Sequence, residues 1–158
     1  MRVFSSDANR SGDEIALLAP DAVHISRVLR MKAGDAVVIC DDVGFEHDCV
    51  LVSVSKDRVL ARIVQSRPYS TEPSVGVTVF AALSKGERFG FLIQKCVEVG
   101  ASAIVPFISE HCVARPDERD YERKQARYAR IALEASKQAL RSRPVQVSAI
   151  QSFEQALQ

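Results

Sequence analysis

The sequence lacks the long apolar segments that mark membrane-spanning and secreted proteins. No run approaches the roughly 18 apolar residues that span a bilayer, and residues 1–12, MRVFSSDANRSG, contain no apolar core of a signal peptide. The 158 residues are 47% hydrophobic, which is enough to bury a core in one domain or in two small ones. We therefore expect a soluble, cytoplasmic protein.

Metal-binding and hydrolase motifs are also missing. The four cysteines, at positions 40, 49, 96 and 112, form no C-x-x-C pair and have no histidine at ligand spacing, so no zinc site is expected. Each cysteine is interpreted as a small buried hydrophobic residue. The three histidines are scattered, and neither a G-x-S-x-G motif nor a Ser-His-Asp order is present. These absences give no support to a zinc protein or a serine hydrolase.

The net charge is small, but the charged residues are unevenly distributed. The net charge is only +1, yet residues 119–158 carry 8 basic and 4 acidic groups, while residues 1–65 carry 8 and 10. A basic C-terminal third suits a surface that faces phosphate groups, because local charge sets the field at a binding face. A solvated helix face without a partner explains the same charges, and the sequence leaves both interpretations open.

The first half of the chain predicts a small β-barrel. The runs AVVICD (36–41) and DCVLVSVS (48–55) flank a turn, and RVLARIVQ (58–65) follows them. One helix is expected at 21–34, with Asp21 as N-cap and Gly34 at its end. The polar segment 66–74, which contains two prolines, predicts a linker.

From residue 75 the pattern alternates between strand and helix. The expected elements are a strand at 75–83, a helix at 85–100 ended by Gly100, a strand at 102–107, a helix at 118–140, a strand at 144–150 and the start of a helix at 152–158. The stripe formed by Phe89, Leu92, Ile93 and Cys96 is expected to pack on the sheet. Continuous apolar strands are typical of parallel sheets, so this half predicts an α/β layer structure.

Several polar residues interrupt this apolar pattern. Lys85 follows a predicted strand, at the edge of an open α/β sheet where ligands usually bind. Glu134, Gln138 and Arg141 recur at i, i+4 and i+7 on the long helix, which fits either an ordinary surface network or groups directed at a partner. Lys95 and Glu98, at i and i+3, either pair with each other or contact a partner.

Four motifs, in this order, resemble the successive signatures of the RsmE family of 16S ribosomal RNA uridine-N3 methyltransferases: HISRVLRMKAGD, LSKGERFGFLIQKCVEVG, IVPFISEHCV and EASKQALRSRPVQV. The resemblance implies a PUA-like RNA-binding barrel at 1–68 and the N-terminal part of a SPOUT-type α/β methyltransferase domain, with a mainly parallel sheet, at 75–158. It also implies S-adenosylmethionine as cofactor, 16S ribosomal RNA or the small ribosomal subunit as partner, and a homodimer.

The resemblance ends before two family segments. The glycine-rich GPEGG loop and the LG-x-x-ILR-x-ETA segment, which in the family form the knot and the cofactor pocket, do not occur in these residues. The resemblance therefore predicts a truncated form or fragment, whose cofactor site lies beyond Gln158 and which alone neither binds the cofactor nor methylates RNA. His111 stands where the family usually has Arg, which replaces a permanent charge with a pH-dependent one.

Methylation of uridine N3 requires that N3 lose its proton and that the base be oriented. Lys85 and Arg141 are candidates for stabilising charge, while Glu134 and Gln138 are candidates for positioning the base or bridging to a second subunit. His24, Arg27 and Arg30 are expected about one turn apart on one helix face, suited to phosphate contacts. The residues expected to bind RNA are His24, Arg27, Arg30, Lys95, Glu98, Arg115 and Arg143.

Two other classes of function remain open from the sequence. A non-catalytic RNA-binding protein, using the barrel and the basic helix, explains the absence of a cofactor pocket better than an enzyme does. It explains the motif KGER at a strand end less well. A dimerisation or scaffold domain without RNA accounts poorly for the basic C-terminal third.

Overall fold

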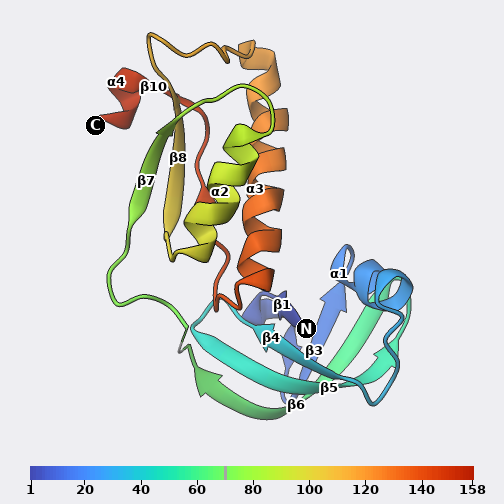
Figure 1. Cartoon of the computed structure of the whole chain (residues 1–158). Coiled ribbons are helices and arrows are strands. Elements are labelled where there is room, and N and C mark those ends of the chain that lie inside the picture. Colours follow the sequence, from blue (N-terminus) through green and yellow to red (C-terminus); the bar gives the residue numbers. More distant parts are fainter. Residues whose placement is uncertain (70) are drawn as a thin grey trace. The chain divides into compact units, whose positions relative to one another are not determined.

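The computed structural model describes residues 1–69 and 71–158 and forms two compact units, Met1–Thr71 and Glu72–Gln158 (Figure 1). Each unit has its own cluster of buried apolar side chains. Within the described residues, no helix has the length and apolarity needed to cross a membrane.

The first unit is a six-stranded mixed sheet that curves into a half-barrel. In spatial order its strands are β1 (Arg2–Phe4), β4 (Ala36–Cys40), β5 (Phe45–Val54), β6 (Arg58–Pro68), β3 (Glu14–Leu18) and β2 (Arg10–Ser11). β1 runs parallel to β4, and the other neighbours are antiparallel. A short 3-10 turn, η1 (Asp7–Asn9), connects β1 to β2. The predicted barrel and its hairpin at residues 36–55 are confirmed.

Alternation of side chains builds the core of this half-barrel. Ile15 and Leu17 on β3, and Val37 and Ile39 on β4, are each at most 2% exposed. Since side chains two apart on a strand share a face, these pairs point to the same interior. The short strand β1 was not predicted, because three residues give no recognisable period.

The predicted helix at 21–34 is wrong beyond its first turn. α1 spans only Asp21–Val23, with Pro20 rather than Asp21 at its N-cap, and it continues as a π-helical turn, η2 (His24–Val28). The Leu29 N–H donates to the carbonyl of His24 at 3.0 Å, and Arg30 then adopts a positive φ of 53° that ends the turn. Tertiary packing of Ala22 and Ile25, both fully buried, takes precedence over the local helical pattern.

The predicted linker at 66–74 is wrong at its start and in its interior. Residues 66–68 are the end of β6, and the Tyr69 N–H donates to the carbonyl of Gly44 at 3.0 Å. Residue 70 lies outside the described residues. Glu72 is anchored within the second unit, where its carboxylate accepts hydrogen bonds from Arg141 and Ser142.

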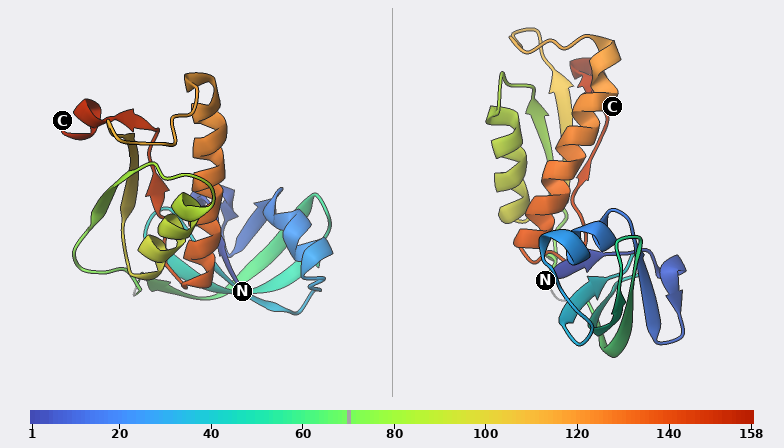
Figure 2. Two further views of the ribbon diagram at one scale, coloured as in Figure 1. Left: turned by 45° about the horizontal axis from the view of Figure 1, so that its top comes forward. Right: turned by 90° about the vertical axis from the view of Figure 1, so that its right-hand side faces the viewer.

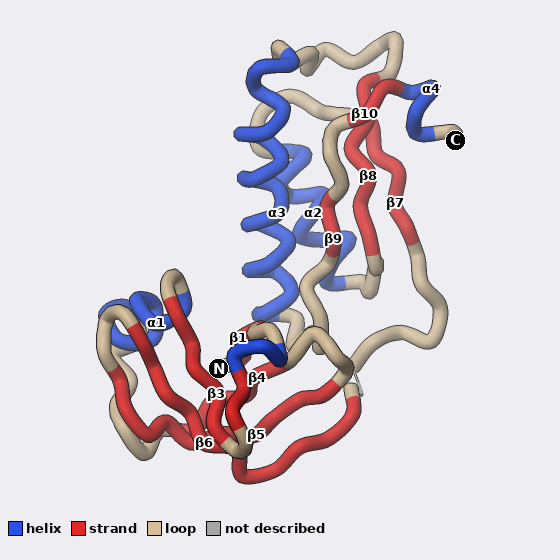
Figure 3. The backbone as a smooth tube through the Cα atoms, turned by 180° about the vertical axis from the view of Figure 1, so that it is seen from behind, coloured by secondary structure: helices blue, strands red, loops and turns tan. Residues whose placement is uncertain are grey.

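The second unit is a parallel sheet with helices between its strands. In chain order it contains β7 (Thr78–Ala82), α2 (Arg88–Glu98), β8 (Ala103–Ile108), the 3-10 turn η3 (Glu118–Asp120), α3 (Tyr121–Gln138), β9 (Gln146–Val147), β10 (Gln151–Ser152) and α4 (Phe153–Ala156). β7 pairs in parallel with β8, which confirms the predicted βαβ order. The predicted third strand at 144–150 is shorter than expected, because only Gln146–Val147 of this range form a strand, β9. β10 (Gln151–Ser152) follows as a separate strand, and both pair in parallel with β8 (Figure 3).

α2 and α3 cover the same face of this sheet (Figures 1 and 2). Phe89 and Ile93 of the predicted stripe are fully buried, and the ring of Phe89 lies 4.9 Å from that of Tyr128 on α3. Leu92 and Cys96 lie at the margin of the stripe and are partly buried, whereas Val97 is fully buried. The apolar face of α2 is therefore centred slightly away from the position that the sequence predicts.

The two long helices end in different ways. α2 ends before Gly100, as predicted, and this glycine has a φ of 101°. After α3 the corresponding left-handed position is occupied by Leu140, with a φ of 55°. The Arg141 N–H donates to the carbonyl of Ser136 (3.0 Å) and the Leu140 N–H to that of Lys137 (3.4 Å), which is the Schellman pattern normally closed by glycine.

Replacing Leu140 with glycine should stabilise the protein. A leucine in the left-handed region costs roughly 1–2 kcal/mol, and its side chain is 59% exposed, so little packing is lost. We expect Leu140→Gly to raise the free energy of unfolding by about 0.5–1 kcal/mol, measured by urea denaturation. The matched control is Ala139→Gly. Because Ala139 has a negative φ, this change should lower the free energy of unfolding. Equal losses in both variants would contradict the strain at Leu140.

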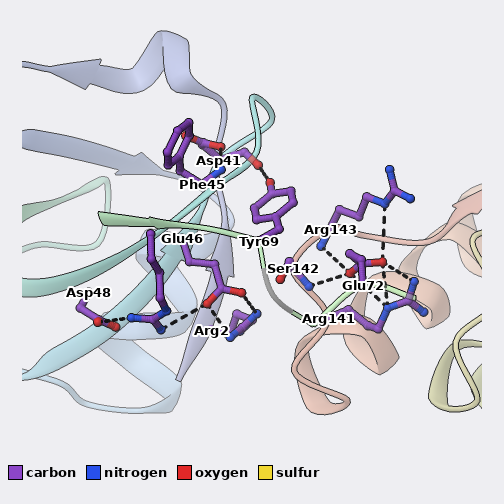
Figure 4. A network of polar contacts seen from close by, with 11 residues as sticks. Arg2, Asp41, Phe45, Glu46, Asp48, Tyr69, Glu72, Arg141, Ser142 and Arg143 are labelled. Atoms are coloured by element: carbon purple, nitrogen blue, oxygen red, sulfur yellow. Dashed lines mark hydrogen bonds and ion pairs between the residues drawn. The ribbon is translucent and has the colours of Figure 1, made fainter. Parts of the chain in front are cut away.

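A buried polar group closes the β4–β5 turn of the first unit (Figure 4). One carboxylate oxygen of Asp41 accepts the N–H groups of Val43, Gly44 and Phe45 at 2.7–3.0 Å. The other lies 3.1 Å from Nε2 of His47, whose Nδ1 lies 2.8 Å from the Ser66 hydroxyl. Burial alone would raise the pKa of Asp41, but these hydrogen bonds outweigh it and lower the pKa below the ordinary value of 3.8.

The stabilisation supplied by Asp41 should disappear in acid. Because its folded pKa is lowered, the contribution is complete above 3.8 and is lost as the pH falls through the folded pKa. We expect Asp41→Asn to lower the free energy of unfolding at neutral pH by about 1–3 kcal/mol, with a smaller difference from wild type in strong acid. Urea denaturation followed by circular dichroism measures this. Asp57→Asn, at an exposed position, is the control. The role of Asp41 would be contradicted if the difference in stability between Asp41→Asn and wild type grew in acid.

Candidate functional site

The two long helices of the second unit run parallel, which fixes the positions of their polar side chains. Arg127 on α3 pairs with Glu87 before α2 (2.6 Å), and Arg141 after α3 donates to the carbonyl of Val97 on α2 (3.1 Å). Gly90 allows the close approach between them, since a Cβ there would lie 3.1 Å from Ile131. The first turns of both helices therefore lie at the carboxyl edge of the sheet, where ligands of α/β proteins usually bind.

A basic hollow lies on the N-terminal half of α3. Its volume is about 650 Å³, and it is lined by Arg123, Lys124, Ala126, Arg127 and Arg130. Arg123 and Arg127 are paired with carboxylates, at 2.9 and 2.6 Å. Among the described residues, the side chains of Lys124 and Arg130 have no hydrogen-bond or ion-pair partner. Their charges remain available to an anionic polymer.

A second groove adjoins the basic hollow, because Arg130 lines both. Its volume is about 310 Å³, and its remaining lining residues are Gln94, Ile131, Glu134, Ala135 and Gln138. The structure thus brings together two of the predicted catalytic residues, Glu134 and Gln138. Sequence reasoning missed Gln94 as part of this group, because only the packing of α2 against α3 places it there.

The other two predicted catalytic residues lie apart. Lys85 is exposed in the bend between β7 and α2, at the carboxyl edge of the sheet. Arg141 lies beside the opposite end of α2 and is only 4% exposed. Its Nη1 donates to the carbonyls of Val97 (3.1 Å) and Ala101 (2.9 Å). Its Nη2 donates to the carboxylate of Glu72 at 2.6 Å (Figure 4). The structure does not join Lys85 and Arg141 in one site.

Glu72 is the partner of Arg141 that the sequence did not reveal. Its carboxylate also accepts the N–H groups of Ser142 (2.8 Å) and Arg143 (3.3 Å), and Nε of Arg143 lies 3.5 Å away. Burial alone would raise the pKa of Glu72, but the hydrogen bonds from Arg141 and Ser142 outweigh it and lower the pKa. Glu72 falls in the predicted linker, where a single acidic residue gives no signal of such a role.

The remaining predicted RNA-binding residues of this unit are exposed. Lys95 and Glu98 form an ion pair of 2.6 Å, which confirms their predicted pairing, and this hydrogen bond lowers the pKa of Glu98. Arg115 donates to the carbonyls of Cys112 (3.2 Å) and Glu110 within the loop before η3. Contact of these three predicted residues with RNA stays a prediction.

His24, Arg27 and Arg30 lie together on the first unit. All three are exposed on the segment that includes η2. They do not share the face of a regular α-helix, because the α-helical geometry ends at Val23 and Arg30 follows the π-helical turn with a positive φ. Their arrangement is therefore set by this irregular turn.

The cysteines are buried or partly buried. Burial raises the pKa of the Cys40 thiol to about 11 and that of Cys49 to about 12, so both are protonated at neutral pH. Within the part of the chain that the structure describes, no group of three His, Cys, Asp or Glu side chains is arranged to hold a metal ion.

The chain combines a half-barrel with a parallel α/β unit that carries an arginine-lined hollow. Comparison with family models makes this specific. Residues 71–158 match the RNA methyltransferase domain, and residues 19–64 match the RNA methyltransferase PUA domain. The chain belongs to this RNA methyltransferase family, as the sequence motifs predict.

Similar proteins support the same assignment. Ribosomal RNA small subunit methyltransferase E of Bacillus subtilis is 36% identical over 135 residues, which cover 85% of this chain and 53% of that protein. The protein of the same name from Synechocystis is 29% identical, over 80% of this chain and 40% of its own length. The chain thus spans about half the length of these curated relatives.

A solved structure confirms the fold. The crystal structure of ribosomal RNA small subunit methyltransferase E from Neisseria gonorrhoeae, bound to S-adenosyl methionine, matches with a TM-score of 0.88 and 29% identity. The match covers 99% of this chain and 64% of that one. The predicted combination of a PUA-like barrel with an α/β methyltransferase domain is therefore confirmed.

Removing the Arg141 side chain should destabilise the second unit strongly. Arg141→Met leaves the buried Glu72 carboxylate without its main partner, which typically costs about 3–5 kcal/mol. We expect the double variant Arg141→Met with Glu72→Met to lose less free energy of unfolding than the two single variants lose together, because it contains no unpaired charge. Urea denaturation of all four proteins measures this coupling.

The control for this cycle is Arg143→Met. Its side chain is 57% exposed, and its contact with the same carboxylate is longer, at 3.5 Å, so the loss should stay below about 1 kcal/mol. Strictly additive losses for Arg141 and Glu72 would show that the pair does not stabilise the unit as described.

Proposed function

We propose that this protein acts on small-subunit ribosomal RNA, in the S-adenosylmethionine-dependent methylation of a uridine at N3. The observation that carries the proposal is the arginine-lined hollow at the carboxyl edge of the sheet, within the unit that matches an RNA methyltransferase domain. The names of the relatives, ribosomal RNA small subunit methyltransferase E, support the class of substrate.

The chemistry assigns roles to the predicted catalytic residues of this unit. Uridine N3 becomes nucleophilic only after losing its proton, so the protein must orient the base and favour its anion. Lys85 is exposed at the carboxyl edge and supplies a positive charge. Glu134 and Gln138, with Gln94 beside them, supply hydrogen-bonding groups that hold the base or a second subunit of a homodimer. The predicted catalytic role of Arg141 stays a prediction, since its guanidinium holds Glu72 and the end of α2.

The Neisseria gonorrhoeae relative binds S-adenosyl methionine, which supports the same cofactor here. The residues that line the two hollows of α3 are assigned to RNA, and none of them is assigned to the methyl donor.

RNA contacts are proposed on both units. In the second unit Lys124 and Arg130 are the central cations, because their charges are unpaired among the described residues. Further phosphate contacts are proposed for the residues that the sequence indicates, namely His24, Arg27, Arg30, Lys95, Glu98, Arg115 and Arg143, with Glu98 acting through its pair with Lys95.

Loss of two cations from the basic hollow should weaken RNA binding and reduce its dependence on salt. For Lys124→Gln combined with Arg130→Gln, we expect the slope of log K against log salt to fall by about 2 on a duplex fragment of small-subunit ribosomal RNA. Fluorescence anisotropy across a salt series measures it. Arg10→Gln with Arg62→Gln, which removes the same charge from β2 and β6, is the control. If the slope for Lys124→Gln with Arg130→Gln equals that of wild type, the basic hollow does not contact the RNA.

Methyl transfer is tested separately from binding. The chain and the product of the complete reading frame that contains it are each incubated with radiolabelled S-adenosylmethionine and small-subunit ribosomal RNA, and the modified nucleoside is identified by mass spectrometry. The proposal predicts that the modified nucleoside in the ribosomal RNA is 3-methyluridine. RNA binding without methyl transfer by either protein would favour a non-catalytic RNA-binding protein.

A further inference from the structure

A hollow of about 470 Å³ lies on the first unit and shares no lining residue with the two hollows of α3. It is lined by Ser26, Arg30, Met31, Lys32, Ala33 and Val54. Its size falls within the range of small-molecule sites in proteins, roughly 300–1,000 Å³. Ser26 lies within η2, the four residues from Arg30 to Ala33 follow it, and Val54 comes from the end of β5.

The backbone of this segment is irregular where it borders the hollow. The Met31 N–H donates to the carbonyl of Ile25 at 3.1 Å, directly after the π-helical turn, and Arg30 between them has a φ of 53°. An arginine is disfavoured in this left-handed region, and both π-turns and such strained residues gather at functional sites. The fully buried side chain of Ile25 anchors the turn in the core of the first unit. The irregular turn places Arg30 in the wall of the hollow.

The rest of the wall is fixed by hydrogen bonds to β5. The Lys32 N–H donates to the carboxylate of Asp35 (2.8 Å), and the Asp35 carbonyl accepts the N–H of Leu51 (2.9 Å). The Gly34 N–H donates to the carbonyl of Leu51 (2.8 Å). Because the loop is pinned on this side, the hollow is formed before any ligand arrives, which reduces the entropy lost on binding.

The lining combines cations with an apolar surface. Among the described residues, the side chains of Arg30 and Lys32 have no hydrogen-bond or ion-pair partner. The Ser26 hydroxyl donates to the carbonyl of Val23 at 3.4 Å, which leaves its oxygen able to accept a hydrogen bond. Met31 and Val54 pack against the core of the unit and expose apolar atoms to the hollow. A ligand that matches carries an anionic group and a flat apolar body.

We propose that this hollow binds one unstacked nucleotide of a single-stranded RNA segment, with its phosphate on Arg30 and Lys32 and its base against Met31 and Val54. The inference rests on the proposed function only in taking RNA as the ligand. Bases in single strands are free to leave the stack and lie on protein side chains, whereas duplex bases are not. The hollow therefore selects single-stranded RNA over duplex.

A membrane surface is the other anionic partner to consider, because Val28 and Leu29 are exposed beside these cations. Interfacial binding, however, requires a helix with a continuous apolar face along its length. α1 is three residues long and passes into a π-helical turn, so no such face exists on this segment. The geometry favours RNA.

The test uses the only two methionines of the sequence, Met1 and Met31, labelled with carbon-13 at the methyl group. Titration with a uridine tetranucleotide should shift the Met31 methyl resonance and leave that of Met1 in place.

The variant Arg30→Gly tests the contribution of the guanidinium. Glycine removes this group and suits the positive φ, so the variant should fold at least as well as wild type. We expect it to lower the affinity about tenfold, as the loss of a charged hydrogen bond does. Arg62→Gln, the same loss of charge on β6, should change it less than about twofold.

The outcomes separate this inference from the proposed function. Two results would overturn the nucleotide site and leave the basic hollow of α3 intact, provided that the protein still binds the ribosomal RNA fragment. One is that the tetranucleotide does not shift the Met31 methyl resonance. The other is that Arg30→Gly and Arg62→Gln have the same affinity for the tetranucleotide. A tetranucleotide that shifts Met31 while Lys124→Gln with Arg130→Gln leaves the salt slope unchanged would support the nucleotide site alone. A shift of Met31 caused by phosphatidylglycerol vesicles and not by RNA would replace RNA with a membrane surface.

Discussion

The buried guanidinium of Arg141 is the interaction on which the second unit depends. It joins three segments that are distant in sequence: Glu72 at the start of the unit, the carbonyls of Val97 and Ala101 around the end of α2, and the turn after α3. A buried charge of this kind requires a carboxylate partner, and Glu72 supplies it. By fixing the ends of α2 and α3 against each other, the ion pair sets the alignment that brings Gln94 beside Glu134 and Gln138.

The cations of this protein divide into two groups with different consequences. Arg141 is buried and Arg2 is partly buried, and their carboxylate partners are Glu72 and Glu46, so they hold the chain together and contribute little field outside it. The side chains of Lys124 and Arg130 on α3, and of Arg30 and Lys32 after η2, have no carboxylate partner among the described residues, so their charges are not neutralised. A net charge of +1 therefore conceals two positive surfaces, one on each unit.

Two residues other than glycine have a positive φ among those described, Arg30 and Leu140, and their strain has different reasons. Leu140 closes the C-terminal turn of α3, where it satisfies carbonyl groups and where glycine would serve better. At Arg30 a glycine would relieve the same strain but would remove the cation from the hollow beside Lys32. The strain at Arg30 accompanies the nucleotide site that we propose there.

The sequence by itself determined the order of the elements and the family. The βαβ pattern, the buried Phe89 and Ile93, the end of α2 at Gly100 and the four motifs are all local signals, readable within one or two turns of chain. The tertiary structure alone decided that Glu72 meets Arg141, that Lys85 and Arg141 lie apart, and that the third strand is shortened to β9, with β10 following as a separate strand. It also decided that the helix after Asp21 turns irregular. These features depend on partners up to 69 residues away, and local propensity carries no information about a contact of that separation.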